Sequence, residues 1–179
     1  MKGVVFTEFL SMVEKQFSAD MVDNVIDDAQ LPHGGAYTTV GTYPHQEMVA
    51  MVVALSQHSG IGVTDLVRAF GKYLFGRFVI GFPSFFHGVD NAFQFLSSIE
   101  NIIHVEVLKL YPDAELPSFD VEHHDAQRLV LLYHSPRHFE DLAEGLMQGC
   151  VAHFGEQIAI TREPAAHGAS HRFHLTRQS

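Results

Sequence analysis

Four side chains of this sequence have the types and spacing to bind one cofactor together. His104 ends an apolar stretch, and further along the chain Tyr133, Ser135 and Arg137 stand at alternate positions. An imidazole nitrogen can bind the iron of a haem, whereas two hydroxyls and a guanidinium suit the two carboxylates that a haem carries. Such a donor pattern also arises by chance, so the assignment depends on the elements that position these residues.

The composition predicts one folded domain, which we assign to residues 1–179. A chain of this length can bury a sizeable core without disulfides. The apolar fraction is 46%, with 15 Phe and no Trp. This phenylalanine content would suit a protein that encloses a large flat hydrophobic ligand, and it would equally suit an ordinary aromatic core.

The charge balance and the single cysteine limit the classes of function. Acidic residues number 21 and basic residues 11, a formal net charge of −10, which argues against nucleic acid as a partner. Cys150 is the only cysteine, so a reducing cytosol is expected. The N-terminus lacks the apolar run of a signal peptide, and no stretch is long enough to span a bilayer. We therefore expect a cytoplasmic protein with no membrane insertion.

The N-terminal half is predicted to be helical. An apolar stripe recurs at helical spacing between positions 3 and 16, Ser18 is expected to cap a second helix, and Pro44 and Thr64 are expected to begin two more. A further helix is expected from Asp90 through His104, with the imidazole in line with the apolar face. An imidazole aimed into a core needs a partner, and a metal is one candidate.

The C-terminal half changes to short strands. Strands are predicted at 118–121, 128–133, 157–161 and 171–176, with a long helix from Ser135–Pro136 to about Phe154. The order predicts an α+β fold, in which an N-terminal helical subdomain packs on a C-terminal antiparallel sheet with a long helix. If the second strand continued extended past Tyr133, alternate residues would project to one side and the three donors would converge.

The chain resembles the bacterial haem-nitric oxide/oxygen binding (H-NOX) domains, the family that includes the haem domain of soluble guanylate cyclase. The similarity covers nearly the whole length. It includes Leu31–Tyr37 (LPHGGAY), Val40–Pro44 (VGTYP), Phe82–Phe86 (FPSFF), Ile103–Val107 (IHVEV), Lys109–Pro112 (KLYP), Leu116–Pro117 and the Y-x-S-x-R pattern. That last pattern is the family's signature for the haem propionates.

By this resemblance, haem b lies between the two subdomains, with His104 as the proximal iron ligand. Tyr133, Ser135 and Arg137 are implied to hold the propionates, and an arginine can grip a carboxylate with two parallel hydrogen bonds. Pro117 matches a proline that presses on the porphyrin and helps bend it. From the residues alone, Pro117 would be a routine proline at the start of a strand.

The resemblance also bears on which gas is bound. In members that hold dioxygen stably, a distal tyrosine donates a hydrogen bond to it, and the matching residue here is Leu142. Other residues implied to line the distal side are apolar: Val5, Phe9, Leu74 and Phe78. Bound dioxygen carries partial negative charge and gains from a donor, whereas nitric oxide depends on one much less. We expect nitric oxide and carbon monoxide to bind and dioxygen to be disfavoured.

The family mechanism implied is a switch without catalysis. Nitric oxide weakens the bond between iron and His104, the helix shifts, and a surface changes shape for a partner to read. Family members that stand alone regulate a histidine kinase or a cyclic-di-GMP enzyme in trans. The alternatives are a haem enzyme such as a peroxidase or nitric oxide dioxygenase, with His138 as a candidate acid–base group, a dioxygen-binding member of the family, and a domain without haem.

No zinc site is expected. Many relatives carry C-terminal cysteines that bind zinc, but this chain has only Cys150, which falls on the buried stripe of the predicted long helix and suits a small core residue. His167, His171 and His174 lie among small polar residues without a thiolate, so they are weak candidates for a replacement metal site.

Overall fold

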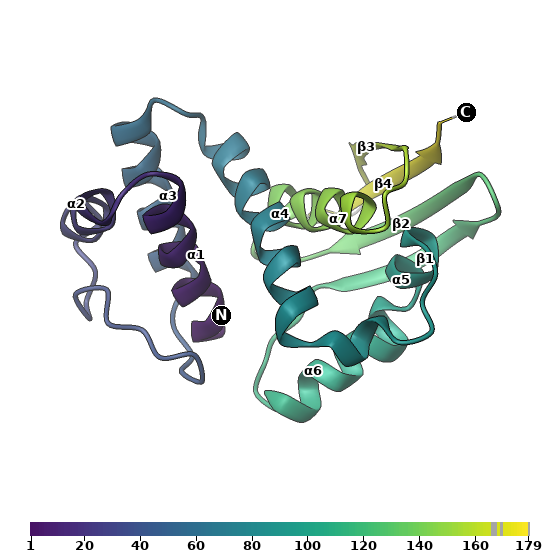
Figure 1. Ribbon diagram of the computed structural model, residues 1–179, viewed down its shortest axis with the longest axis horizontal. Helices are drawn as coiled ribbons and strands as arrows, with labels where there is room; N and C mark the ends of the chain where they lie inside the picture. The colour runs from purple at the N-terminus through teal and green to yellow at the C-terminus, as the bar shows by residue number, and fades with distance from the viewer. Residues whose placement is uncertain (166–167, 169, 179) are drawn as a thin grey trace.

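The computed structural model describes residues 1–165, 168 and 170–178, and its helical subdomain lies beside a subdomain built on a four-stranded sheet (Figure 1). The helical subdomain contains α1 (Gly3–Gln16), α2 (Ala19–Ala29) and α3 (His45–Ser59), and the long helix α4 (Val63–Gly81) runs between the two. The other elements are η1 (Pro83–Phe86), α5 (Ala92–Ser97), the π-helix η2 (Ile99–Ile103), α6 (His104–Leu110), β1 (Ser118–His124), β2 (Arg128–His134), α7 (Glu140–His153), β3 (Ile158–Pro164) and β4 (Ser170–Arg177).

The N-terminal helices largely follow the predicted signals. The hydroxyl of Ser18 accepts a hydrogen bond from the Met21 N–H at 3.0 Å, so Ser18 caps α2 as expected. Helix α3 begins directly after Pro44. Helix α4 begins at Val63, which makes Thr64 part of the helix and not its cap. Among the residues that the structure describes, no helix is long and apolar enough to cross a membrane.

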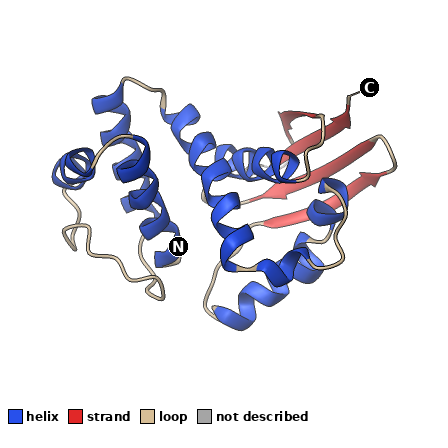
Figure 2. Ribbon diagram, viewed as in Figure 1, coloured by secondary structure: helices blue, strands red, loops and turns tan. Residues whose placement is uncertain are grey.

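The sheet is antiparallel with strand order β1-β2-β4-β3, and α7 packs against it (Figure 2). Leu129, Leu131 and Tyr133 alternate along β2 and are almost completely buried. They form one core with Met147 and Cys150 of α7. This arrangement confirms the predicted α+β class, because one face of the sheet obtains its apolar cover from the long helix.

The helix predicted from Asp90 through His104 is interrupted. Asn91, not Asp90, caps α5, since its side chain accepts from the Gln94 N–H at 3.0 Å. The chain then forms the π-helix η2, in which the Ile103 N–H donates to the Ser98 carbonyl at 3.4 Å, before α6 begins at His104. An apolar pattern does not distinguish a π-helical turn from an α-helical one, so the predicted in-line helix was wrong.

The helix predicted from Ser135 begins later than expected. Strand β2 ends at His134, a turn follows, and α7 begins at Glu140. Within the turn, His138 has a left-handed backbone conformation (φ 55°) and its N–H donates to the Ser135 carbonyl at 3.3 Å. A residue in that conformation cannot continue an α-helix, so Ser135 and Pro136 belong to a turn between strand and helix.

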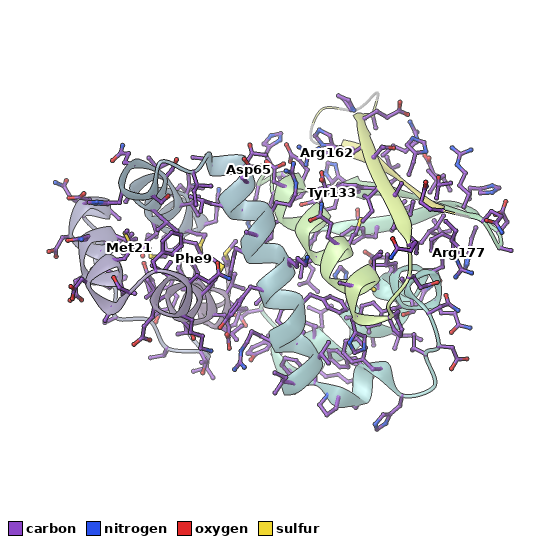
Figure 3. All side chains as sticks on the ribbon, turned by 45° about the horizontal axis from the view of Figure 1, so that its top comes forward. Phe9, Met21, Asp65, Tyr133, Arg162 and Arg177 are labelled. Carbon is purple, nitrogen blue, oxygen red and sulfur yellow. The ribbon has the colours of Figure 1, made fainter. Side chains whose placement is uncertain are left out.

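Helices α4 and α7 approach each other closely through glycines. A Cβ atom on Gly145 of α7 would lie 2.1 Å from the Arg68 carbonyl oxygen of α4. A Cβ atom on Gly71 of α4 would lie 2.5 Å from the Leu142 carbonyl oxygen of α7. Hydrophobic cores lie on both sides of this crossing: Phe9 belongs to the core of the helical subdomain and Tyr133 to that of the sheet (Figure 3). The crossing therefore joins the two halves of the molecule.

The substitution Gly145→Ala is expected to destabilise the fold, because its methyl group would force α4 and α7 apart. We expect a loss of about 1–3 kcal/mol in the free energy of unfolding, measured by denaturant titration. The matched control is Gly76→Ala on the exposed side of α4, where a Cβ would meet nothing within 4 Å. It should leave stability unchanged or raise it by up to about 1 kcal/mol. Equal stability of the two variants would contradict the role of the crossing.

Candidate functional site

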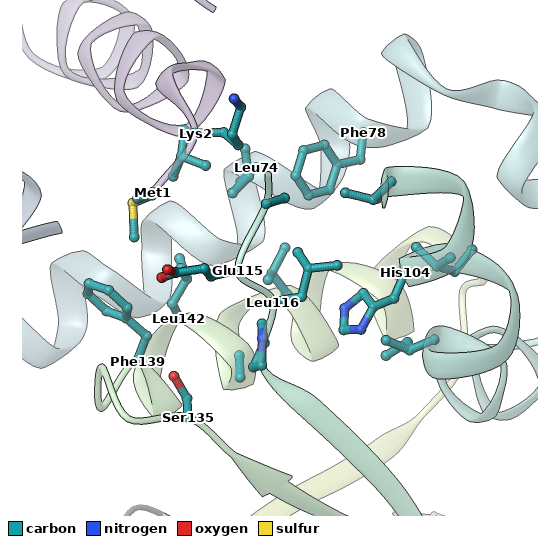
Figure 4. A pocket seen from close by; sticks show the side chains of 18 of the residues that line it. Met1, Lys2, Leu74, Phe78, His104, Glu115, Leu116, Ser135, Phe139 and Leu142 are labelled. Carbon is teal, nitrogen blue, oxygen red and sulfur yellow. The ribbon is translucent and has the colours of Figure 1, made fainter. Parts of the chain in front are cut away.

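A cavity of about 820 Å³ lies between the two subdomains. Its walls come from α1, α4, α7, η2, α6 and the segment that leads into β1, and most of the side chains that line it are apolar. Close up, the imidazole of His104 projects from its helix toward the interior of the pocket, and Leu74 and Leu142 project from other helices (Figure 4). The volume and apolar lining suit a cofactor-sized ligand.

His104 presents a largely buried imidazole to this cavity. Its side chain is 14% exposed, and its Nδ1 lies 3.2 Å from the Glu100 Oε1. Burial lowers the pKa of His104, and the nearby Glu100 carboxylate opposes this effect in part. The imidazole is therefore neutral at neutral pH. With its proton on Nδ1 toward Glu100, it can offer the Nε2 lone pair to a metal.

Tyr133, Ser135 and Arg137 all line the same cavity, as predicted, but a turn and not an extended strand brings them together. The Arg137 N–H donates to the Ser135 hydroxyl at 3.3 Å, which holds the turn closed. Burial raises the pKa of Tyr133 to about 12, so its phenol stays protonated and can donate. The Arg137 guanidinium forms an ion pair with the carboxylate of Glu115, so it can hold a carboxylate at this end of the cavity.

Two further cationic or titratable groups at this end were not predicted. The N-terminal ammonium of Met1 and the imidazole of His45 belong to residues that line the cavity. Burial lowers the pKa of His45, and the charges of Arg137 and the N-terminus lower it further. The positive charge of Arg137 therefore disfavours a protonated His45 at this end of the cavity. Met1 begins a stretch, Met1–Gly3, that resembles the family, but neither residue was predicted to have a chemical role, so only the folded chain places them at the cavity.

The predicted distal residues fall into two groups. Val5, Leu74, Phe78 and Leu142 line the cavity. Phe9 does not: it is completely buried in the helical core, with its ring centroid 5.2 Å from that of Phe70. Phe9 lies one turn beyond Val5 on α1, so its side chain packs against α4 and does not reach the cavity.

Pro117 also lines the cavity, directly before β1. Its rigid ring therefore lies where it can press on a bound ligand, as the family resemblance implies. It also directly precedes a strand, as expected from the residues alone, so both interpretations fit its position. Leu116 beside it lines the cavity too. Both residues come from the loop that carries Glu115, the ion-pair partner of Arg137.

Cys150 is fully buried in the sheet core, and burial raises the pKa of its thiol. This confirms the predicted core position and makes the thiol unreactive. Within 1–165, 168 and 170–178, no three His, Cys, Asp or Glu side chains gather as a metal site. His171 and His174 lie on β4, where His174 contacts Arg128 and Glu163, and His167 falls outside the described residues.

The donor set and the cavity fit a haem. The cavity offers an imidazole to a metal, hydroxyl and guanidinium donors to carboxylates, and apolar side chains along most of its lining. A flat apolar ligand with a central metal and two carboxylates at one edge has this distribution of chemistry.

Comparison with known proteins agrees with this chemistry. A sequence model of the family described as Haem-NO-binding matches residues 2–162. The H-NOX protein from K. algicida, solved in the unliganded Fe(II) state, is 36% identical with a TM-score of 0.92, over 100% of this chain and 97% of that one. The Shewanella woodyi H-NOX in the Fe(II)CO state is 40% identical with a TM-score of 0.86, over 99% and 95%. The S. oneidensis H-NOX in the Fe(II)NO state is 26% identical with a TM-score of 0.91, over 100% of both chains.

Among curated proteins, none gives a significant match. The family match nevertheless covers most of the chain, and the structural matches cover nearly all of it at high similarity. The chain therefore belongs to the Haem-NO-binding family, the haem-binding gas sensors known as H-NOX proteins.

Proposed function

We propose that residues 1–179 form one H-NOX domain that acts as a cytoplasmic, haem-based sensor of nitric oxide and also binds carbon monoxide. In this proposal His104 is the proximal ligand of a haem b, and Tyr133, Ser135 and Arg137 hold its propionates. The observation that carries the proposal is the buried imidazole of His104 in the same cavity as these three donors. A ferrous haem held in this cavity would supply the site at which a diatomic gas binds, and His104 would be the residue that passes the effect of binding to the protein.

The apolar wall of the cavity supports selectivity for nitric oxide and carbon monoxide over dioxygen. Leu74, Phe78 and Leu142 line this wall, and none of them can donate a hydrogen bond. Tyr43 also lines the cavity, but its hydroxyl is bound to Thr38: it accepts from the Thr38 N–H at 2.9 Å and lies 3.3 Å from the Thr38 Oγ1, to which it can donate. Dioxygen would lack the donor that its partial negative charge requires. Relatives solved in the Fe(II)NO and Fe(II)CO states support the choice of gases.

The position of His104 supports the proposed transmission of the signal. It is the first residue of α6, directly after the π-helix η2. These two short helices expose apolar side chains, among them Ile102, Val105 and Leu108. Loss of a bond to His104 would therefore shift these helices and change the exposed surface that they form. A partner in trans, a histidine kinase or a cyclic-di-GMP enzyme, can recognise that surface.

A sensor is favoured over a haem enzyme because the cavity lacks a free acid–base group on its apolar wall. His138, the candidate for that role, is exposed in the turn before α7 and does not line the cavity. His45 lines the cavity at the end that holds Arg137. Neither imidazole lies on the wall formed by Leu74, Phe78 and Leu142, where peroxide chemistry would need it.

The substitution His104→Ala is expected to abolish stable haem binding, because it removes the proposed iron ligand. Removal of a residue that hydrogen-bonds to a metal ligand lowers metal affinity by up to about 100-fold. Removal of the ligand itself should lower the affinity for haem by more than this. Soret absorbance per mole of purified protein measures it, and imidazole added during expression should restore it. His138→Ala, outside the cavity, is the control and should load haem normally. Normal loading of His104→Ala without imidazole would exclude His104 as the ligand.

The substitution Leu142→Tyr is expected to create a dioxygen complex, because a phenol on the apolar wall can donate to bound dioxygen. A hydrogen bond to a partly charged acceptor contributes about 1.5–3 kcal/mol, which corresponds to about 10- to 100-fold tighter dioxygen binding. Absorption spectra of the reduced protein in aerated buffer measure the change. Leu142→Phe supplies similar bulk without the hydroxyl and should behave like the wild type. A stable dioxygen complex of the wild type would overturn the proposed selectivity.

A further inference from the structure

The carboxylate of Glu100 contacts both His104 and the sheet. Its Oε1 lies 3.2 Å from the His104 Nδ1 and also accepts a hydrogen bond from the Phe119 backbone N–H at 2.6 Å. Phe119 is at the start of β1, and its ring centroid lies 6.0 Å from that of His104. One oxygen atom therefore connects the imidazole to the first strand of the sheet.

This contact depends on the irregular helix before His104. Glu100 lies in the π-helix η2, which ends where α6 begins, so the two residues are four positions apart across the junction of two helices. Single π-helical turns occur frequently at functional sites. The Glu100 side chain remains only 34% exposed, and its oxygen is held by a backbone donor. The carboxylate is thus positioned by the sheet and not left to sample solvent.

We propose that Glu100 is a positioning residue for the iron ligand: it holds the His104 proton on Nδ1, turns Nε2 toward the cavity and increases the electron density of the imidazole. The proposal rests on the function proposed above. A ligating histidine commonly donates its other N–H to a carboxylate or carbonyl, and this partner sets the tautomer, the ring orientation and the basicity of the ligand. Because the same Glu100 oxygen binds the Phe119 N–H, the orientation of the imidazole is also tied to β1.

Glu106 offers a matched control on the other side of His104. Its carboxylate contacts Lys109 at 2.5 Å, its side chain is 42% exposed, and it does not line the cavity. Glu106→Gln removes the same charge from the neighbouring helix α6 without touching the imidazole. It therefore separates an effect of the Glu100 contact from an effect of net charge.

The test compares the wild type with Glu100→Gln, Glu100→Ala and Glu106→Gln as reduced, haem-loaded proteins. Resonance Raman spectra report the iron–His stretching band, which a merely structural role of Glu100 would not move. We expect this band to shift to lower frequency in Glu100→Gln and further in Glu100→Ala, and to stay in place in Glu106→Gln. Haem affinity should fall by about 10-fold or more in Glu100→Ala, and the fraction of the nitric oxide complex that has lost His104 should rise in both Glu100 variants.

If the wild type shows His104-ligated haem but the iron–His band of haem-loaded Glu100→Gln is unchanged, the proposal for Glu100 is overturned and the proposed function is not. A wild type without a Soret band would overturn the proposed function instead. If the Glu100 variants retain too little haem for Raman spectra, NMR of the wild type labelled with ¹⁵N-histidine tests the proposal instead. A slowly exchanging proton on the Nδ1 of His104 supports the proposal, and an unprotonated or rapidly exchanging Nδ1 overturns it.

Discussion

The close crossing of α4 and α7 is the contact on which the rest of the site depends. Gly71 and Gly145 allow each backbone to approach the other's carbonyl oxygens, a distance that no side chain would permit. Since α4 carries Leu74 and Phe78 and α7 carries Leu142, this crossing places the apolar wall of the cavity. It also joins the helical core to the sheet core, so the cavity has one wall that cannot open without loss of packing on both sides.

The opposite wall is built from weaker elements. Helices η2 and α6 are short, and several of their apolar side chains are exposed. His104 lies at their junction, with its Nδ1 3.2 Å from the Glu100 carboxylate. Elements with few buried contacts move at lower cost than a packed helix crossing. A rigid apolar wall combined with a more compliant segment that carries His104 suits the proposed sensor, because a change at His104 would move only that segment of the cavity lining.

Local patterns predicted much of this arrangement. The spacing of apolar residues predicted the bounds of α1, the alternation along β2 and the α+β class. The Ser18 cap depends on a single local hydrogen bond, which the residue type predicted. The predictions failed where tertiary structure overrides the local pattern. The π-helix η2 has the same kind of apolar residues as an α-helix. The left-handed conformation at His138 prevents α7 from beginning earlier, and the sequence has no glycine at that position that would indicate such a conformation. Phe9 has the right helical spacing from Val5, yet packs on Phe70 outside the cavity.

The three donors line one cavity although the structural explanation predicted for their convergence is wrong. An extended strand would have placed alternate side chains on one face, but β2 ends at His134. The turn that follows closes through the Ser135 hydroxyl and carbonyl, which bind the N–H groups of Arg137 and His138. Ser135 therefore shapes the turn, in addition to the donor role proposed for its hydroxyl. A spacing that must satisfy both the turn and the cavity is more restricted than one that must satisfy either alone, and this restriction gives a short pattern its specificity.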